Sequence, residues 1–283
     1  MNKILSLSIL TLLGLIGSTQ SPNISWVAIG DSITYLNEHT SETGGRITKG
    51  YMTLVTEKLN NISYSNQGHN GWTSSDIVDS IEVLKIQKAD VYSIFLGTND
   101  WWQGRRIGTS EDYINNTGNG TFYGSFRRII DKLRTLNNDA RIILITPLQR
   151  ADFVNIGDFR NNAWGSYRKK NEQSLADFAE AIAEIGKIGH FDVIDLYNDP
   201  VLKIDNLIKF KRVKDPLTST YKNYPYPDFI DIPFNAETDD YPYPGEAIDL
   251  TYDGLHPSDK GYAIIADRLI NLLKTYNCNS GKL

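Results

Sequence analysis

The 283-residue chain carries a formal net charge of −5, and 22% of its residues are charged against 40% hydrophobic. This ordinary globular composition excludes a disordered or fibrous chain and is sufficient for one large domain with a full core. The negative charge argues against a nucleic-acid or anionic-membrane partner, because phosphate binding needs a basic surface. The single cysteine, Cys278, excludes an internal disulfide.

The first twenty residues predict a signal peptide. Lys3 supplies a positive charge, an almost uninterrupted apolar run covers residues 4–17, and small or polar residues occupy 18–21. This run is shorter than a membrane span requires, although an uncleaved anchor is the alternative. Residues 21–283 contain no second apolar stretch of spanning length, so we expect no stable membrane insertion. Secretion without disulfides favours a bacterial periplasm or exterior.

Short β-branched runs alternate with amphipathic stretches along the rest of the chain. Strands are predicted over residues 25–29, 62–66, 90–96, 141–146 and 190–196. Helices are predicted over 51–60, 76–84, 124–136, 162–185 and 258–276. Five strands separated by helices predict a parallel sheet covered on both faces, an α/β three-layer sandwich. Ligands of such sheets bind beyond the carboxyl ends of the strands.

The segment 205–251 breaks this alternation, because it is dense in tyrosine, proline and acidic residues. The prolines disfavour regular helix, so we expect an ordered insertion anchored by its aromatic side chains. Its position directly before Asp253 favours a wall of the substrate cleft, and a surface insertion without function is the alternative. The acidic residues do not match a calcium-binding loop, so no metal is expected.

Three polar blocks follow predicted strands. The first, Gly30-Asp31-Ser32, places a serine at the carboxyl edge of the sheet, where its own N–H at a helix start can donate to an oxyanion. The second spans residues 66–73 and contains Gly68 and Gly71, whose backbone can approach a ligand closely. The third, residues 97–100, contains Asn99, a neutral amide donor for a substrate carbonyl. Each block alone is also a good turn or cap sequence.

A fourth block, residues 253–257, joins an acid to a histidine. Asp253 and His256 are three residues apart, so both can face one nucleophile from a tight turn. The carboxylate would orient the imidazole and stabilise its protonated form, while the imidazole removes a serine proton. His69 has no carboxylate two or three residues away, so we interpret it as a polar or cleft-lining residue.

In this order the four blocks resemble those of the SGNH, or GDSL-type, ester hydrolase family, over nearly the whole chain after the leader. The resemblance implies the flavodoxin-like SGNH fold, a reaction without metal or cofactor, and a Ser32–His256–Asp253 catalytic set. It implies Ser32, Gly71 and Asn99 as oxyanion donors, with Gly71 matching the family pattern better than Gly68. Ile33 stands where the family often has leucine, a mild change in the same packing role.

Aromatic residues flank the predicted oxyanion donors and bear on the substrate. Trp72, Trp101 and Trp102 would leave little room for a long acyl chain and offer flat faces for sugar rings. We therefore expect these tryptophans, together with Asp31, to bind substrate, and the reaction to remove acetyl groups from carbohydrate. The alternatives are core tryptophans, a lipase or lysophospholipase, a thioesterase, and a catalytically inactive glycan-binding module. The sequence makes no prediction of oligomeric state.

Overall fold

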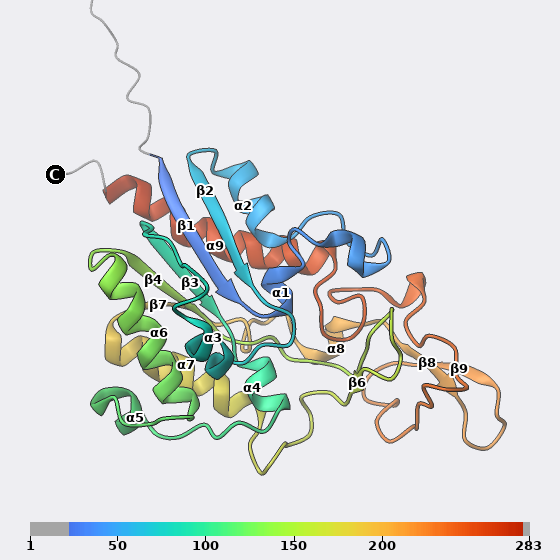
Figure 1. The fold of residues 1–283 in the computed structure, drawn as a ribbon. Coiled ribbons are helices and arrows are strands. Elements are labelled where there is room, and N and C mark those ends of the chain that lie inside the picture. Colours follow the sequence, from blue (N-terminus) through green and yellow to red (C-terminus); the bar gives the residue numbers. More distant parts are fainter. Residues whose placement is uncertain (1–22, 280–283) are drawn as a thin grey trace, which may run out of the picture.

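The computed structural model describes residues 23–279, and the predicted signal peptide lies outside the described residues. A five-stranded, entirely parallel sheet forms the centre, with strand order β2-β1-β3-β4-β7 (Figure 1). Its strands are β1 (Ile24–Gly30), β2 (Ile62–Gly68), β3 (Val91–Phe95), β4 (Arg141–Ile145) and β7 (Asp192–Ile194). This arrangement confirms the predicted α/β sandwich.

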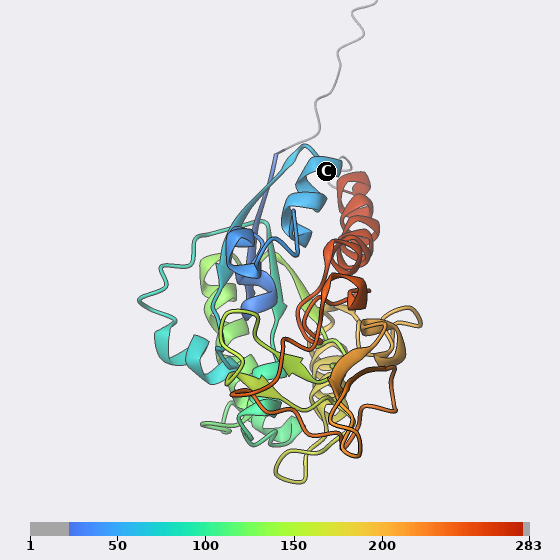
Figure 2. The same ribbon diagram turned by 90° about the vertical axis from the view of Figure 1, so that its right-hand side faces the viewer.

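Helices cover both faces of the sheet. Helices α2 and α9 lie on one side and α3, α6 and α7 on the other, as Figures 1 and 2 show from two directions. The helical segments are α1 (Ser32–Tyr35), η1 (Thr40–Thr43), α2 (Tyr51–Lys58), α3 (Ser74–Ser80), α4 (Thr98–Trp102), α5 (Ser110–Asn115), α6 (Phe122–Leu136), α7 (Leu175–Gly189), α8 (Ile204–Leu207), η2 (Gly245–Ala247) and α9 (Asp259–Asn279). Because the helices shield both faces, each central strand can be apolar throughout.

Alternation along β3 shows how one strand serves two cores. Val91 and Phe95 enter the core beneath α2 and α9, whereas Tyr92 and Ile94 enter the core beneath α6 and α7. All four side chains are at most 1% exposed. Successive strand residues point to opposite faces, so a continuous apolar run is what a doubly covered strand requires.

The prediction of one helix over residues 162–185 is wrong in its first half. Helix α7 begins at Leu175, where Ser174 and Asp177 form a capping box. Residues before it form β6 (Asn162–Ala163), which pairs in antiparallel fashion with β5 (Phe153–Val154). The apolar spacing of Leu175, Phe178 and Ile182 was a valid helical signal, but the capping box places the helix start far downstream.

Segment 205–251 forms a separate packed region beyond the carboxyl ends of the strands (Figure 1). It contains a hairpin of β8 (Lys211–Lys214) and β9 (Tyr221–Tyr224), which was not among the predicted strands. Phe229, Tyr243 and Ala247 form a small third core together with Ala151 and Val154. The aromatic side chains of this segment therefore pack against Ala151, before β5, and Val154, within β5. Within residues 23–279, no helix combines the length and apolar character that a membrane span would need.

Candidate active site

Ser32 sits at the junction between β1 and α1, at the carboxyl edge of the sheet. Asp31 is the N-cap of α1, and its Oδ1 accepts a hydrogen bond of 3.0 Å from the backbone N–H of Ile33. The strand-to-helix turn therefore places the serine at the first position of the helix, where backbone N–H groups are free of helical partners. Ser32 Oγ lies 2.8 Å from Nε2 of His256.

His256 and Asp253 reach Ser32 from the loop before α9. Asp253 Oδ2 lies 2.7 Å from His256 Nδ1, while its Oδ1 accepts the backbone N–H groups of Leu255 and His256 at 3.0 and 2.7 Å. Both side chains are buried. The Phe153 ring meets the imidazole edge-on, with ring centroids 5.5 Å apart. The three residues predicted as nucleophile, base and acid thus form one continuous chain of hydrogen bonds.

The loop carrying Asp253 depends on a glycine. Gly254 has φ of +90°, and a Cβ at this position would lie 1.9 Å from the carbonyl oxygen of Asp152. The carbonyl of Gly254 accepts the N–H of Ala151 at 2.9 Å. A residue with a side chain would both strain the backbone and separate these two segments. The close approach therefore ties the Asp253 loop to the chain leading into β5.

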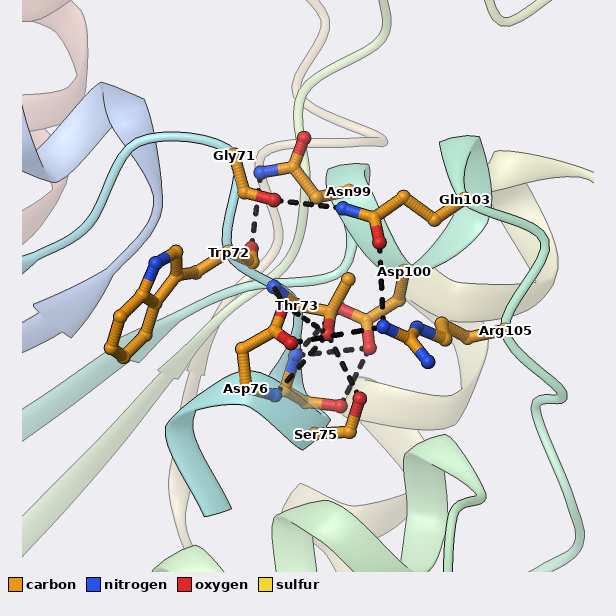
Figure 3. Close-up of polar contacts among 10 residues, drawn as sticks. Gly71, Trp72, Thr73, Ser75, Asp76, Asn99, Asp100, Gln103 and Arg105 are labelled. Atoms are coloured by element: carbon orange, nitrogen blue, oxygen red, sulfur yellow. Dashed lines mark hydrogen bonds and ion pairs between the residues drawn. The ribbon is translucent and has the colours of Figure 1, made fainter. Parts of the chain in front are cut away.

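Asn99 and Gly71 face Ser32 from two further strand ends, and all three residues line one cleft. Asn99 Nδ2 donates to the carbonyl oxygen of Trp72 at 3.0 Å, which orients the amide and leaves its second N–H for a ligand (Figure 3). Gln103 Nε2 donates to the carbonyl oxygen of Gly71 at 2.8 Å. These two bonds hold the Gly71 turn against α4.

Gly71 and Gly68 have different structural roles. Gly71 has φ of +74°, and no atom within 4 Å would oppose a Cβ there. At Gly68 a Cβ would lie 2.2 Å from the backbone nitrogen of Tyr35, so this glycine permits β2 to pack closely against α1. Only Gly71 of the two lines the cleft. The geometry therefore favours Gly71 as the candidate oxyanion donor.

Two buried carboxyl groups lie around this edge of the sheet. Asp100 accepts hydrogen bonds from the backbone N–H and hydroxyl of Ser74 at 3.0 and 2.6 Å, which ties α4 to α3. Burial raises the pKa of Asp100 to about 7, against the opposing effect of those bonds. Burial likewise raises the pKa of Asp31 to about 6, although the Ile33 N–H and the nearby His256 partly counteract it.

The cleft in front of Ser32 has a volume of about 310 Å³. Its lining residues are Ser32, Leu36, Glu42, Asn70, Gly71, Asn99, Trp102, Gln103, Arg150, Phe153, Asn155, Ile156, Asn161, Ala163, Tyr252, Asp253, Leu255 and His256. The structure describes every residue of segment 205–251, and none of them lines the cleft. The prediction that this segment forms a wall of the cleft is therefore wrong. Residues 150–163 form that wall, and 205–251 packs behind it. The end of this wall, at Ala163, falls within residues 162–185, where a helix was wrongly predicted.

The candidate substrate-binding residues divide into different environments. Trp102 lines the cleft, but Trp101 is fully buried and donates from Nε1 to the carbonyl oxygen of Gln173 at 3.1 Å. Trp72 stacks on His69, with ring centroids 4.1 Å apart, and lies outside the cleft lining. Asp31 is buried as the cap of α1. Trp101 and Asp31 are enclosed by protein and, like Trp72, are not among the residues that line the cleft, which corrects the expected substrate contact.

A parallel α/β sandwich with a serine, histidine and aspartate hydrogen-bonded in series beyond its strands has the organisation of a serine hydrolase. Residues 23–279 hold no group of three His, Cys, Asp or Glu side chains placed to bind a metal. The model of the GDSL-like lipase/acylhydrolase family matches residues 28–264. The chain belongs to this family of hydrolases, which act on esters.

Two solved structures illustrate the similarity. A possible lipase from Chitinophaga pinensis is 57% identical, and the match covers 89% of this chain and 98% of the other, with a TM-score of 0.88. A protein from Lactobacillus plantarum is 19% identical over 90% of this chain and 99% of its own, with a TM-score of 0.58, and shares the fold. No curated protein matches the sequence significantly.

Proposed function

We propose that the protein is a secreted serine ester hydrolase in which Ser32 is the nucleophile, His256 the general base and Asp253 its partner. One observation carries the assignment. The hydrogen-bond chain from Ser32 through His256 to Asp253 opens directly on the cleft, with distances of 2.8 and 2.7 Å. Secretion is supported by the charged and apolar pattern of residues 3–17.

The proposed reaction proceeds in two halves. Ser32 Oγ attacks the ester carbonyl while His256 accepts its proton, and the oxyanion is stabilised by the N–H groups of Ser32 and Gly71 and by Asn99 Nδ2. His256 then protonates the leaving alcohol. Water enters, loses a proton to His256 and attacks the acyl-enzyme, and the acid departs as Ser32 regains its proton. Asp253 orients His256 and stabilises the imidazolium formed in each half.

We propose short acyl groups, acetyl above all, on carbohydrate hydroxyls as the substrate class. The cleft volume of about 310 Å³ lies at the lower end of ordinary ligand pockets. Five carboxamide side chains line the cleft and can exchange hydrogen bonds with sugar hydroxyls. They belong to Asn70, Asn99, Gln103, Asn155 and Asn161.

A lipase is the second candidate, because the cleft also contains Leu36, Phe153, Ile156 and Leu255. The similar protein from Chitinophaga pinensis is itself described as a possible lipase. A thioesterase would use the same nucleophile and base. An inactive glycan-binding module is disfavoured, since binding alone would not need the ordered Ser32–His256–Asp253 contacts.

Labelling with a fluorophosphonate tests the nucleophile. We expect one covalent adduct on Ser32 in the native chain and none in Ser32→Ala, and an unlabelled native protein would support a binding module instead. Acetate release from acetylated glycans, set beside hydrolysis of nitrophenyl acetate and octanoate, then tests the acyl group. Acetyl should be preferred over octanoyl, and the reverse preference would favour the lipase.

A further inference from the structure

Arg150 is a buried cation in the wall of the cleft. It lines the cavity in front of Ser32 although the residue is only 2% exposed. Its guanidinium carbon lies 4.7 Å from the ring centroid of Trp101 and 4.7 Å from that of Trp102. One terminal nitrogen, Nη2, donates to the carbonyl oxygen of Trp164 at 2.6 Å. The aromatic rings and this bond therefore hold the guanidinium in a defined position.

The charge of Arg150 has no carboxylate partner among residues 23–279. The charges of Asp152 and Asp253 favour the protonated form of Arg150, but neither carboxylate forms a salt bridge with it. Asp152 is engaged by Lys211 Nζ at 2.6 Å and by the N–H of Gly165 at 2.9 Å. Both oxygens of Asp253 are engaged by residues of its own loop. Burial lowers the pKa of Arg150 to about 9, so the side chain remains protonated at neutral pH.

Arg150 also has N–H groups that make no hydrogen bond within residues 23–279. A guanidinium has five N–H donors, and in the described structure Arg150 uses one of them. Its Nε is buried without an acceptor. The other carboxylate of the cleft, Glu42, is exposed and accepts the Tyr35 hydroxyl at 2.9 Å. The cleft is thus lined by a cation that has no salt-bridge partner among residues 23–279, and its terminal N–H groups are suited to a carboxylate.

We propose that Arg150 binds a carboxylate on the substrate, so that this enzyme is selective for esters that carry a negative charge, such as acetylated uronic-acid sugars. A bound carboxylate would supply both the missing counter-charge and acceptors for unused N–H groups. This inference rests on the proposed ester hydrolase function and narrows its substrate class.

Two matched substrate pairs test the proposal and locate the charge. The first compares acetylated methyl glucuronoside with acetylated methyl glucoside, which differ only in a carboxylate on the alcohol side. The second compares nitrophenyl hydrogen glutarate with nitrophenyl pentanoate, which differ in a carboxylate on the acyl side. For each pair, kcat and KM are measured with the native protein and with Arg150→Gln, Arg150→Lys and Lys170→Gln. Lys170 is the matched control, because its Nζ also lies over the Trp102 ring, at 4.6 Å, outside the cleft lining.

We expect the native protein to prefer the anionic member of at least one pair by about tenfold or more in kcat/KM, mainly through KM. Arg150→Gln should reduce that preference to about twofold or less, Arg150→Lys should retain part of it, and Lys170→Gln should retain it all. Equal native activity on both members of both pairs would overturn the proposal. So would a preference that survives in Arg150→Gln, or an equal loss of activity on both members of each pair in that variant.

A binding measurement separates this inference from the proposed reaction. Calorimetric titration of Ser32→Ala protein with methyl glucuronoside, methyl glucoside and glutarate needs no hydrolysis. Binding of a carboxylate compound, and its loss when Arg150→Gln is added to Ser32→Ala, would support the anion site even if no ester were cleaved. Failure of both carboxylates to bind Ser32→Ala protein, while the native protein hydrolyses nitrophenyl acetate, would refute the anion site and leave the hydrolase assignment intact.

Discussion

The wall of the cleft that carries Ser32, Asn99 and His256 differs from the opposite wall, residues 150–163, in what holds it in place. Ser32 and Asn99 each follow a central strand directly, at the first turns of α1 and α4. The opposite wall has only the two-residue strands β5 and β6, and its position depends on Gly254 and on the small core shared with segment 205–251.

We expect the first wall to carry out the reaction and the second wall, residues 150–163, to select the substrate. Ser32 and Asn99 are positioned by short-range structure, a strand end followed by a helix start, and Asp253 and His256 share one tight loop before α9, so the sequence patterns of all four are compact. On the other wall, Phe153 packs against Leu255 and His256, about a hundred positions away, and Arg150 lies over the rings of Trp101 and Trp102, about fifty positions away. Changes on the first wall should therefore affect turnover, whereas changes on the second should affect substrate preference and stability.

The largest expected effect lies on the first wall. Asp253→Asn should lower kcat for nitrophenyl acetate by about 10⁴-fold, because an amide at this position favours the wrong imidazole tautomer. Asp249→Asn is the control, since this carboxylate forms a surface ion pair with Lys260, and kcat of this variant should change less than about twofold. A loss below about tenfold in a folded Asp253→Asn protein would contradict the role of Asp253 as the partner of His256.

Removing the proposed oxyanion donor should have the next largest effect. Asn99→Ala should lower kcat by about 10²–10³-fold, equivalent to roughly 2.7–4 kcal/mol of barrier, with a much smaller change in KM. Loss of the bond to the Trp72 carbonyl should destabilise the fold by only about 1 kcal/mol. Urea denaturation beside the kinetics separates the two contributions, and near-normal turnover would exclude Asn99 from the oxyanion site.

The link between the two walls can be broken at Gly254. Gly254→Ala should reduce the free energy of unfolding by about 2–4 kcal/mol, because a Cβ would collide with the Asp152 carbonyl and φ is positive. Gly120→Ala is the control: its φ is +77° with no atom within 4 Å of the new Cβ, so it should cost about 1–2 kcal/mol. If urea denaturation shows equal losses of unfolding free energy in the two variants, the close contact between Gly254 and the Asp152 carbonyl adds nothing to the cost of the substitution.

The smallest effect concerns pH and the buried Asp100. Its pKa of about 7 in the folded protein exceeds the ordinary 3.8, so the folded state binds this proton more tightly than the unfolded chain. Stability from this group is therefore present below about pH 4 and is lost as the pH rises towards 7. Asp100→Asn cannot ionise and should therefore flatten this decline, measured by urea denaturation from pH 4 to 8. Parallel curves for native and variant proteins would contradict this pKa.

Particular residues show why the predicted strands were confirmed and why the environment of each tryptophan could not be predicted. The five strands could be predicted because residues such as Val91 and Ile143 are apolar in runs that only a doubly covered sheet explains. Trp101 and Trp102 are neighbours in sequence, yet one is core and one faces the cleft. Successive helical residues point about 100° apart, and the sequence does not reveal which direction faces the cleft.

By itself, the sequence determined the parallel sandwich, the family and the four blocks containing Ser32, Gly71, Asn99 and His256, since strand periodicity and helix starts are local properties. The tertiary structure alone decided that residues 150–163 form the second wall and that segment 205–251 supports them from behind. It also decided that Arg150 lines the cleft without a salt-bridge partner in the described part of the chain. Those outcomes depend on packing between distant segments, because the burial and pairing of a side chain are set by neighbours that local sequence does not specify.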